Sequence, residues 1–276
     1  MDAAGWVPAL VGAAMVPVMY WLVARIGNWK TGLVSALFIA VIGGQYLSRS
    51  LYGHLDHHIA ETLFSTLFCL LYVVSLYSLK VHEINFKKHS TMKIPLVYGV
   101  ICGVSYLLGL LTMFTMVVFG LFVAIFTLIQ FIISHRSGKP TAYLLVLNVI
   151  AFAVVAIGML IYGIQDMSFS FYSYSLGVFC AHIGVIVGTI VLYAISTVLV
   201  KKQMPWYYYP AALAILVVIV TGITAVAVPS LFNTAIGSLS GFFATHAAHS
   251  TISELAASTT QGATTPFGWG LLFASG

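Results

Sequence analysis

Residues 96–133 carry no charged side chain, and this stretch is 38 residues long and mostly apolar. One helix of this length would extend about 57 Å, at about 1.5 Å per residue, whereas the hydrocarbon core of a bilayer is about 30 Å thick. The stretch therefore predicts two membrane-spanning helices joined by a tight turn, which we expect near Gly109. Hydrophobic residues make up 61% of the chain and charged residues only 6%, which excludes a soluble domain and indicates a membrane protein.

Other apolar runs of about 20 residues predict further spanning helices. The expected fold is all-α: a polytopic membrane protein with about eight full transmembrane helices and a truncated ninth, which begins near residue 265. A long outer loop precedes this last helix, and residues 1–276 are expected to form a single, incomplete transmembrane domain. The eight full helices are expected near residues 6–25, 31–48, 59–79, 94–111, 113–134, 142–163, 172–200 and 207–229.

The basic residues predict the orientation of these helices. Ten of the eleven Lys and Arg residues fall in four breaks that lie on the same side of the membrane, and the positive-inside rule makes that side cytoplasmic. The net charge of +5 is thus an orientation signal and gives no reason to expect nucleic acid as a partner. Arg49 is the exception, because it falls in the loop over residues 48–61, which is expected outside.

This outer loop carries the sequence SRSLYGHLDHHIAE, which concentrates charge between two apolar segments. Asp56, His58 and Glu61 lie close together at the expected N-terminus of a helix, and a carboxylate with one imidazole suits Mn²⁺, Mg²⁺ or zinc. Asp56 could instead cap the helix, whose N-terminus favours a negative charge. His54 and His57 are expected to point elsewhere and to lie in the membrane interface.

A second outer loop, over residues 230–264, contains a single acidic residue, Glu254. Long loops of this kind are functional or mobile, and Glu254 could also be a solvated residue in a capping box with Thr251. Two histidines of this loop, His246 and His249, are three residues apart and could bind a metal if they lie on a helix. His182 lies within an apolar run, where a hydrogen-bonded packing histidine and a functional group are both conceivable.

The two outer motifs together resemble a known family. SRSLYGHLDHH, followed about 200 residues later by TISE in a long outer loop, is similar to the catalytic subunit of oligosaccharyltransferase, most closely the archaeal type. The resemblance implies a dolichyl-diphosphooligosaccharide-protein glycosyltransferase, which transfers a glycan from a dolichyl phosphate or pyrophosphate to asparagine in Asn-Xaa-Ser/Thr. If the first helix here is the second of the family, the two motifs fall in the second and fifth outer loops of the family, as they should.

The resemblance also implies roles for individual residues. Asp56 and His58 would bind Mn²⁺ or Mg²⁺, and Asp56 and Glu254 would be catalytic, with Glu254 accepting a hydrogen bond from the amide nitrogen of the acceptor asparagine. The expected partners are a lipid-linked oligosaccharide, an acceptor polypeptide and membrane lipid, in the plasma membrane of an archaeon or bacterium with the active face outside. Supporting roles fall to Arg49, near the acceptor peptide or the lipid phosphate, to Thr251, which would help to order the outer loop, and to Glu61, which follows the motif and would support its geometry.

The chain also departs from the family pattern. The family has an additional metal-binding Asp in its first outer loop, for which Asp2 is a poor substitute, and it has further helices and a soluble domain with a Trp-Trp-Asp-Tyr-Gly signature. The sequence therefore looks like the middle of such an enzyme, and the chain is expected to be inactive alone, unless other chain segments supply the missing parts.

Two other functions remain open from the sequence. A transporter would use His182, Asp56 and Glu254 along a path. Such proteins carry polar groups near the bilayer midplane, but apart from His182 the sequence lacks charged candidates there, and its candidate site residues lie at one face. A different membrane metalloenzyme would be built from the outer histidines, namely His54, His57, His58, His246 and His249.

Overall fold

The computed structural model describes residues 3–42, 45–54, 56–82, 84–139, 141–171 and 173–241. These residues are mostly helical and contain no β-strand, only one isolated bridge between Asp166 and Ser175. Seven helices in this part of the chain are long and apolar enough to cross a membrane. The predicted class, an all-α polytopic membrane protein, is thereby confirmed. The ninth helix expected near residue 265 lies outside the described residues.

The chain divides into two compact units. The first comprises the described residues of Met1–Leu70 and Ile236–Gly276, and the second comprises those of Leu71–Ala235. In chain order the helices are η1 (Ala3–Trp6), α1 (Val7–Ile26), α2 (Trp29–Val41), α3 (Gln45–Arg49), α4 (His57–Lys80), α5 (His89–Thr112), η2 (Phe114–Met116), α6 (Val117–Arg136), α7 (Ala142–Tyr162), α8 (Leu176–Lys201), α9 (Tyr208–Ala227) and α10 (Pro229–Gly241).

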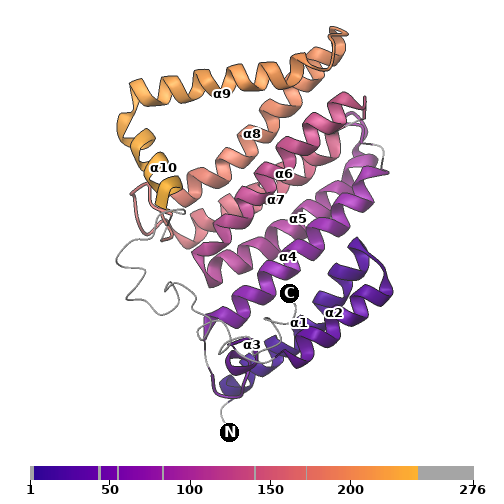
Figure 1. Ribbon diagram of the computed structural model, residues 1–276, viewed down its shortest axis with the longest axis vertical. Coiled ribbons are helices and arrows are strands. Elements are labelled where there is room, and N and C mark those ends of the chain that lie inside the picture. Colours follow the sequence, from indigo (N-terminus) through magenta and orange to yellow (C-terminus); the bar gives the residue numbers. More distant parts are fainter. Residues whose placement is uncertain are drawn as a thin grey trace, which may run out of the picture. The chain divides into compact units, whose positions relative to one another are not determined.

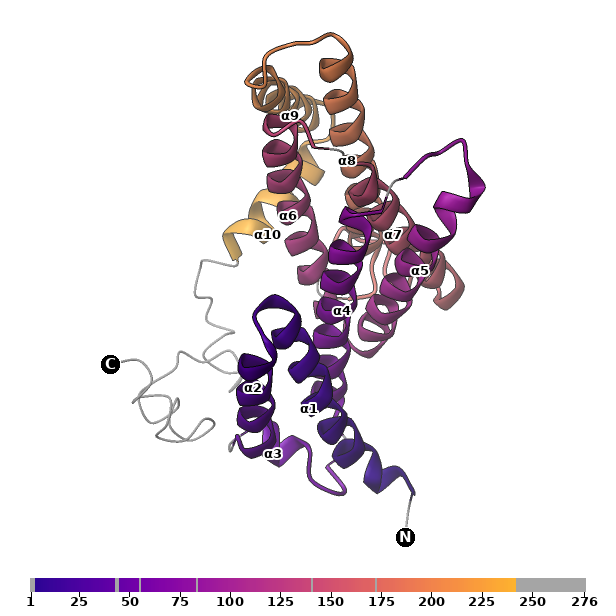
Figure 2. The ribbon, with the colours of Figure 1, turned by 90° about the vertical axis from the view of Figure 1, so that its right-hand side faces the viewer.

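In the first unit, α1 and α2 lie side by side and run in opposite directions (Figure 2). The reversal begins at Asn28, whose side-chain oxygen accepts hydrogen bonds from the N–H groups of Lys30 and Thr31 at 2.9 and 3.1 Å. The Thr31 hydroxyl accepts in turn from the Asn28 N–H at 3.0 Å, which completes a capping box. A Cβ on Gly32 would lie 2.7 Å from the Cβ of Ala24, so a glycine there permits the two helices to approach.

The second helix differs from the expected helix over residues 31–48. α2 ends at Val41, the backbone of Ile42 is extended (ψ 120°), and a separate short helix, α3, begins at Gln45. The 13 residues of α2 would measure about 20 Å, which is less than the thickness of a bilayer core. The sequence Gly43-Gly44 follows Ile42, and glycine is among the weakest helix formers.

The uncharged stretch over residues 96–133 forms two helices, as predicted. The break lies at Met113, whose backbone is extended (φ −155°, ψ 133°), four residues after the expected position. Gly109 lies in the last turn of α5, where its carbonyl accepts a hydrogen bond from the Met113 N–H at 2.9 Å. A Cβ on Gly109 would lie 2.9 Å from the Met116 side chain, so this glycine lets η2 fold back against α5.

The core of the second unit contains a polar node. α7 packs against α5 and α8, and α6 packs against α8 (Figure 1). The buried Asn148 side chain of α7 accepts a hydrogen bond from the Tyr72 hydroxyl of α4 at 2.7 Å. Its amide nitrogen donates to Thr127 of α6 at 2.8 Å and lies 3.4 Å from the Thr189 hydroxyl of α8. One side chain thus links four helices away from water, where unpaired polar groups are costly.

His182 lies in the same core and is only 1% exposed. Its Nδ1 is 2.7 Å from the Val178 carbonyl oxygen, and its Nε2 is 2.9 Å from the Tyr106 hydroxyl. Both ring nitrogens therefore have hydrogen-bond partners within the bundle. This geometry agrees with a hydrogen-bonded packing histidine.

The C-terminal ends of α6 and α8 and the N-terminal end of α9, which are expected on the cytoplasmic side, meet at one end of the second unit. The Arg136 guanidinium lies over the Trp206 ring, 4.9 Å from its centroid. His135 Nδ1 is 2.9 Å from the Ser196 hydroxyl, and the His135 ring stacks on Tyr209 with centroids 4.5 Å apart. Basic and aromatic residues gather at this end, as the positive-inside rule and the interfacial aromatic belt predict.

The outer loop expected over residues 230–264 begins with a helix instead. α10 covers Pro229–Gly241, directly after a break at Val228 (φ −138°, ψ 68°). Proline is favoured at the first position of a helix, because its fixed φ suits the helix and its missing N–H would have no partner there. Pro229 is therefore the sequence signal that marks the start of this helix.

Candidate metal site at the start of α4

The site lies in the first unit, between the end of α3 and the start of α4. α3 ends at Arg49, and the following turn contains Gly53 with φ +82°, a left-handed conformation that glycine adopts at little cost. Asp56 stands immediately before His57, the first residue of α4. Its Oδ1 lies 3.4 Å from the N–H of His58, so the carboxylate is placed as an N-cap, as the capping alternative predicts.

Arg49 is held against Asp56 by a short ion pair. The Nη1 of Arg49 donates to Oδ2 of Asp56 at 2.6 Å, and the two side chains are 19% and 21% exposed. Charge-assisted hydrogen bonds of this kind are among the stronger ones in proteins. The exceptional basic residue on the expected outer side therefore has a local partner, which accounts for its position.

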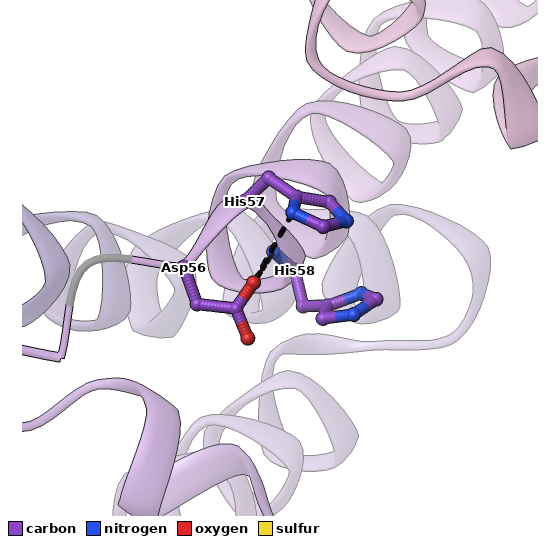
Figure 3. Close-up of side chains that lie close together, drawn as sticks. All are labelled: Asp56, His57 and His58. Atoms are coloured by element: carbon purple, nitrogen blue, oxygen red, sulfur yellow. Dashed lines mark hydrogen bonds and ion pairs between the residues drawn. The ribbon is translucent and has the colours of Figure 1, made fainter. Parts of the chain in front are cut away.

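The histidines on both sides of Asp56 turn toward its carboxylate. The Nδ1 of His57 is 3.2 Å from Oδ1 of Asp56 (Figure 3), and the Nε2 of His54 is 3.9 Å from Oδ2. The expectation that both rings point elsewhere is therefore wrong. It assumed a regular backbone, but a turn ends and a helix begins within these few residues, so side-chain periodicity does not apply.

The described residues contain one cluster suited to a metal ion, formed by Asp56, His57 and His58. Each offers one ligand atom, and these atoms lie within 4.8 Å of one another. One carboxylate oxygen and two imidazole nitrogens suit a first-row divalent ion such as Mn²⁺ or Zn²⁺ better than Ca²⁺, which prefers oxygen alone. The donor set therefore fits a divalent metal, and His57 joins the expected pair of Asp56 and His58.

Glu61 supports this cluster from the next turn of α4. Its Oε2 lies 3.3 Å from Nδ1 of His58, the distance expected for side chains three residues apart on a helix. A carboxylate that contacts one ring nitrogen of a histidine fixes the orientation of the ring and, where the other nitrogen binds a metal, raises the basicity of that ligand. This geometry agrees with the supporting role predicted for Glu61.

The other predicted site residues lie outside the described residues. These are Glu254, Thr251, His246 and His249 of the outer loop, together with Asp2. The acidic residue Asp166 belongs to the second unit, where Ser168 and Ser173 donate to its carboxylate at 2.7 to 3.0 Å. The N–H and hydroxyl of Ser168, followed by the hydroxyl of Ser173, hold the pKa of Asp166 below its usual value. This carboxylate orders its own loop.

Comparison with known proteins decides the family. The family described as oligosaccharyl transferase STT3, N-terminal, matches residues 1–269. The chain belongs to this family. An archaeal relative, dolichyl-phosphooligosaccharide-protein glycotransferase 3 of Archaeoglobus fulgidus, is 24% identical over 170 residues, which are 62% of this chain and 19% of the relative. The dolichyl-monophosphooligosaccharide–protein glycotransferase AglB of Haloferax volcanii is 25% identical over 241 residues, 82% of this chain and 22% of the relative. The chain thus spans about a fifth of the length of these curated relatives.

Solved structures of the Archaeoglobus fulgidus oligosaccharyltransferase share the fold. The complex of AglB with an inhibitory peptide and a dolichol-phosphate matches with a TM-score of 0.80 and 21% identity, over 99% of this chain and 32% of that one. The complex with Zn and sulfate matches with a TM-score of 0.68 and 20% identity, over 87% of this chain and 30% of that one. The predicted family resemblance is thereby confirmed, together with the integral membrane character.

Proposed function

We propose that this chain forms the membrane-embedded, metal-binding part of an oligosaccharyltransferase. The reaction transfers a glycan from a dolichyl phosphate or pyrophosphate carrier to the asparagine of an Asn-Xaa-Ser/Thr acceptor. The observation that carries the proposal is the cluster of Arg49, Asp56, His57 and His58, found in a chain of this family. The names of the relatives support the donor and the acceptor, since one solved relative holds a dolichol-phosphate and another an acceptor peptide with the NVT sequon.

The metal would be held by Asp56 and His58, with His57 as a third donor. We propose Mn²⁺ or Mg²⁺ as the physiological ion, and the Zn in a solved relative supports a site that accepts divalent ions. When bound, the ion supplies Lewis-acid stabilisation of the departing lipid phosphate. Asp56 would bind the ion through its carboxylate, whose Oδ2 also pairs with Arg49.

Arg49 would also act on the lipid donor. Its guanidinium is permanently charged, and its fixed fork of N–H donors suits phosphate oxygens. Its ion pair with Asp56 holds it beside the candidate metal ligands. The guanidinium would therefore supply positive charge next to the lipid phosphate and stabilise the negative charge that develops on the leaving group.

Glu254 and Thr251 would handle the acceptor. An amide nitrogen is a weak nucleophile because its lone pair is delocalised into the carbonyl. A carboxylate at Glu254 that accepts hydrogen bonds from the asparagine N–H groups would hold the nitrogen in place and favour a twisted amide. Thr251 would help to order the loop over the acceptor, and such positioning lowers the entropic barrier.

The site is proposed to face the outside of the plasma membrane of an archaeon or bacterium. In the first unit, the N–H of Gly53 donates to the Gly5 carbonyl at 2.9 Å, so the turn before Asp56 contacts the beginning of the η1–α1 segment. Arg25 lies in the last turn of α1, which 20 residues place about 30 Å away. The site and the basic residue therefore belong to opposite ends of a membrane-spanning helix, as the positive-inside rule requires of an extracytoplasmic site.

A chimera tests the proposed function. The matching segment of the Archaeoglobus fulgidus enzyme is replaced by this chain, and glycan transfer to an Asn-Val-Thr peptide is measured with Mn²⁺ present. We expect transfer by the chimera and a loss of about 100-fold or more with Asp56→Ala, since a metal ligand is removed. The control is Asp166→Asn, which alters an acidic residue of the second unit and should retain transfer. A folded chimera without transfer, or one that transfers equally well with Asp56→Ala, would contradict the proposal.

A further inference from the structure

One face of the η1–α1 segment holds the loop that leads to the metal site. The residues buried along this face are Gly5, Pro8, Gly12 and Met15, spaced three or four residues apart as expected for one side of a helix. We propose that Gly12, together with the Tyr46 side chain that binds its carbonyl, positions Arg49 and Asp56 for metal binding. This inference rests on the proposed function and adds residues that touch neither metal nor substrate.

The closest approach is between Gly12 and Ser50. A Cβ on Gly12 would lie 2.6 Å from the Cβ of Ser50 and 3.8 Å from its Cα. Carbon atoms of residues that are distant in the chain do not approach to 2.6 Å, so a side chain at position 12 must displace Ser50. Because Ser50 follows Arg49 directly in the chain, a displacement of Ser50 carries the guanidinium away from Asp56.

Two hydrogen bonds connect the segment over residues 46–53 to the buried face of the η1–α1 segment. The Tyr46 hydroxyl of α3 donates to the Gly12 carbonyl at 2.7 Å. The N–H of Gly53 donates to the Gly5 carbonyl at 2.9 Å. These bonds lie three residues before and four residues after Arg49. The polypeptide is therefore fixed on both sides of the arginine and shortly before Asp56.

The metal cluster has little tolerance for movement of this segment. Arg49 and Asp56 are paired at 2.6 Å, and the candidate ligand atoms already lie up to 4.8 Å apart. A shift of about 1 Å would break the ion pair and rotate the Asp56 carboxylate relative to His58. Changes in the residues that orient metal ligands commonly weaken metal affinity by about 10- to 100-fold.

The test measures Mn²⁺ affinity of the purified full chain in lipid nanodiscs, by electron paramagnetic resonance of the free ion, together with thermal stability. Gly12→Ala is compared with Gly103→Ala, which creates a clash of the same kind in the second unit, 2.5 Å from the Ala151 carbonyl oxygen. Gly222→Ala serves as a second control, since nothing lies within 4 Å of the added Cβ. Both controls are helical glycines of spanning segments and lie outside the first unit.

We expect Gly12→Ala to raise the dissociation constant for Mn²⁺ about 10-fold or more, while Gly103→Ala lowers stability at unchanged affinity. The double variant Gly12→Ala/Ser50→Gly should restore the affinity, because the Cα of Ser50, at 3.8 Å, is then the nearest atom of that residue. Tyr46→Phe, which removes only the hydrogen bond to the Gly12 carbonyl, should weaken binding several-fold and serves if Gly12→Ala does not fold.

Three results would overturn the inference. The first is a folded Gly12→Ala with the affinity of the unsubstituted chain, or, where Gly12→Ala does not fold, an unchanged affinity of Tyr46→Phe. The second is an equal loss of affinity in Gly12→Ala and Gly103→Ala, which would indicate general destabilisation. The third is a double variant as weak as Gly12→Ala alone. An unsubstituted chain that binds no Mn²⁺ would instead contradict the metal site of the proposed function itself.

Discussion

The contact between α5 and α7 predicts a large effect of one added methyl group. A Cβ on Gly103 would lie 2.5 Å from the Ala151 carbonyl oxygen, 2.7 Å from the Cβ of Val154 and 3.1 Å from the Cα of Ala151. Two of these atoms belong to backbone, so no side-chain rotation relieves the clash, and the two helices must separate by about 1 Å to reach ordinary contact. Overpacking of this kind costs about 1–3 kcal/mol, and the better helix propensity of alanine returns at most about 1 kcal/mol.

The matched substitution is Gly222→Ala in α9, where the added Cβ meets nothing within 4 Å. No clash opposes the gain in helix propensity at this position, so we expect the substitution to stabilise the protein by about 0.4–1 kcal/mol. Reversible unfolding of both purified variants in mixed detergent micelles, followed by tryptophan fluorescence, gives the two free energies of unfolding. The reasoning predicts that Gly103→Ala is the less stable variant by about 1–3 kcal/mol. Equal stabilities, or a more stable Gly103→Ala, would refute the packing of α5 on α7.

Two further predictions concern polar groups of the second unit. Tyr72→Phe removes the hydroxyl that donates to Asn148 and should lower the free energy of unfolding by about 0.6–1.7 kcal/mol. The control is Tyr207→Phe, at an exposed position. Equal effects of the two substitutions would count against the polar node. Hydrogen bonds from Ser168 and Ser173 lower the pKa of Asp166 in the folded protein. The ionised carboxylate therefore stabilises the fold above the unfolded pKa of about 3.9, and this stabilisation is lost as the pH falls through the lower folded pKa. A titration of the free energy of unfolding should show this acid loss in the wild type and less of it in Asp166→Asn, and superimposable curves would exclude it.

Most of the helices follow from the sequence alone, because a bilayer requires about 20 apolar residues for each crossing. The division of residues 96–133 was predicted for this reason, although its turn lies at Met113 and not at Gly109. Local backbone chemistry decided two other places where the prediction differed. α2 ends at Val41, before a Gly-Gly pair, and α10 begins at a proline within the expected loop.

The candidate site was predicted in part. Asp56, His58, Glu61 and Arg49 were identified from the motif, and they lie in one cluster with the ion pair and hydrogen bonds described above. His57 was missed because the direction of a side chain at a turn–helix junction depends on backbone angles that spacing does not reveal.

The contact between α1 and the segment that carries Arg49 could not be predicted from the sequence, for a different reason. Gly12 and Tyr46 are 34 residues apart, and neither carries a chemical signal of its own. The polar node of the second unit is similar, since Asn148 appears in the sequence as one polar residue within an apolar helix. Its partners, which include Tyr72 and Thr127, come from other helices.

The central claim is that Asp56 and its neighbouring histidines form a divalent metal site, and pulsed electron paramagnetic resonance of Mn²⁺ bound to the purified chain tests it most directly. The account predicts a nitrogen hyperfine coupling from a directly bound imidazole, which weakens with His58→Ala, and a loss of bound Mn²⁺ with Asp56→Ala. Bound Mn²⁺ without nitrogen coupling, or an affinity unaffected by Asp56→Ala, would contradict it.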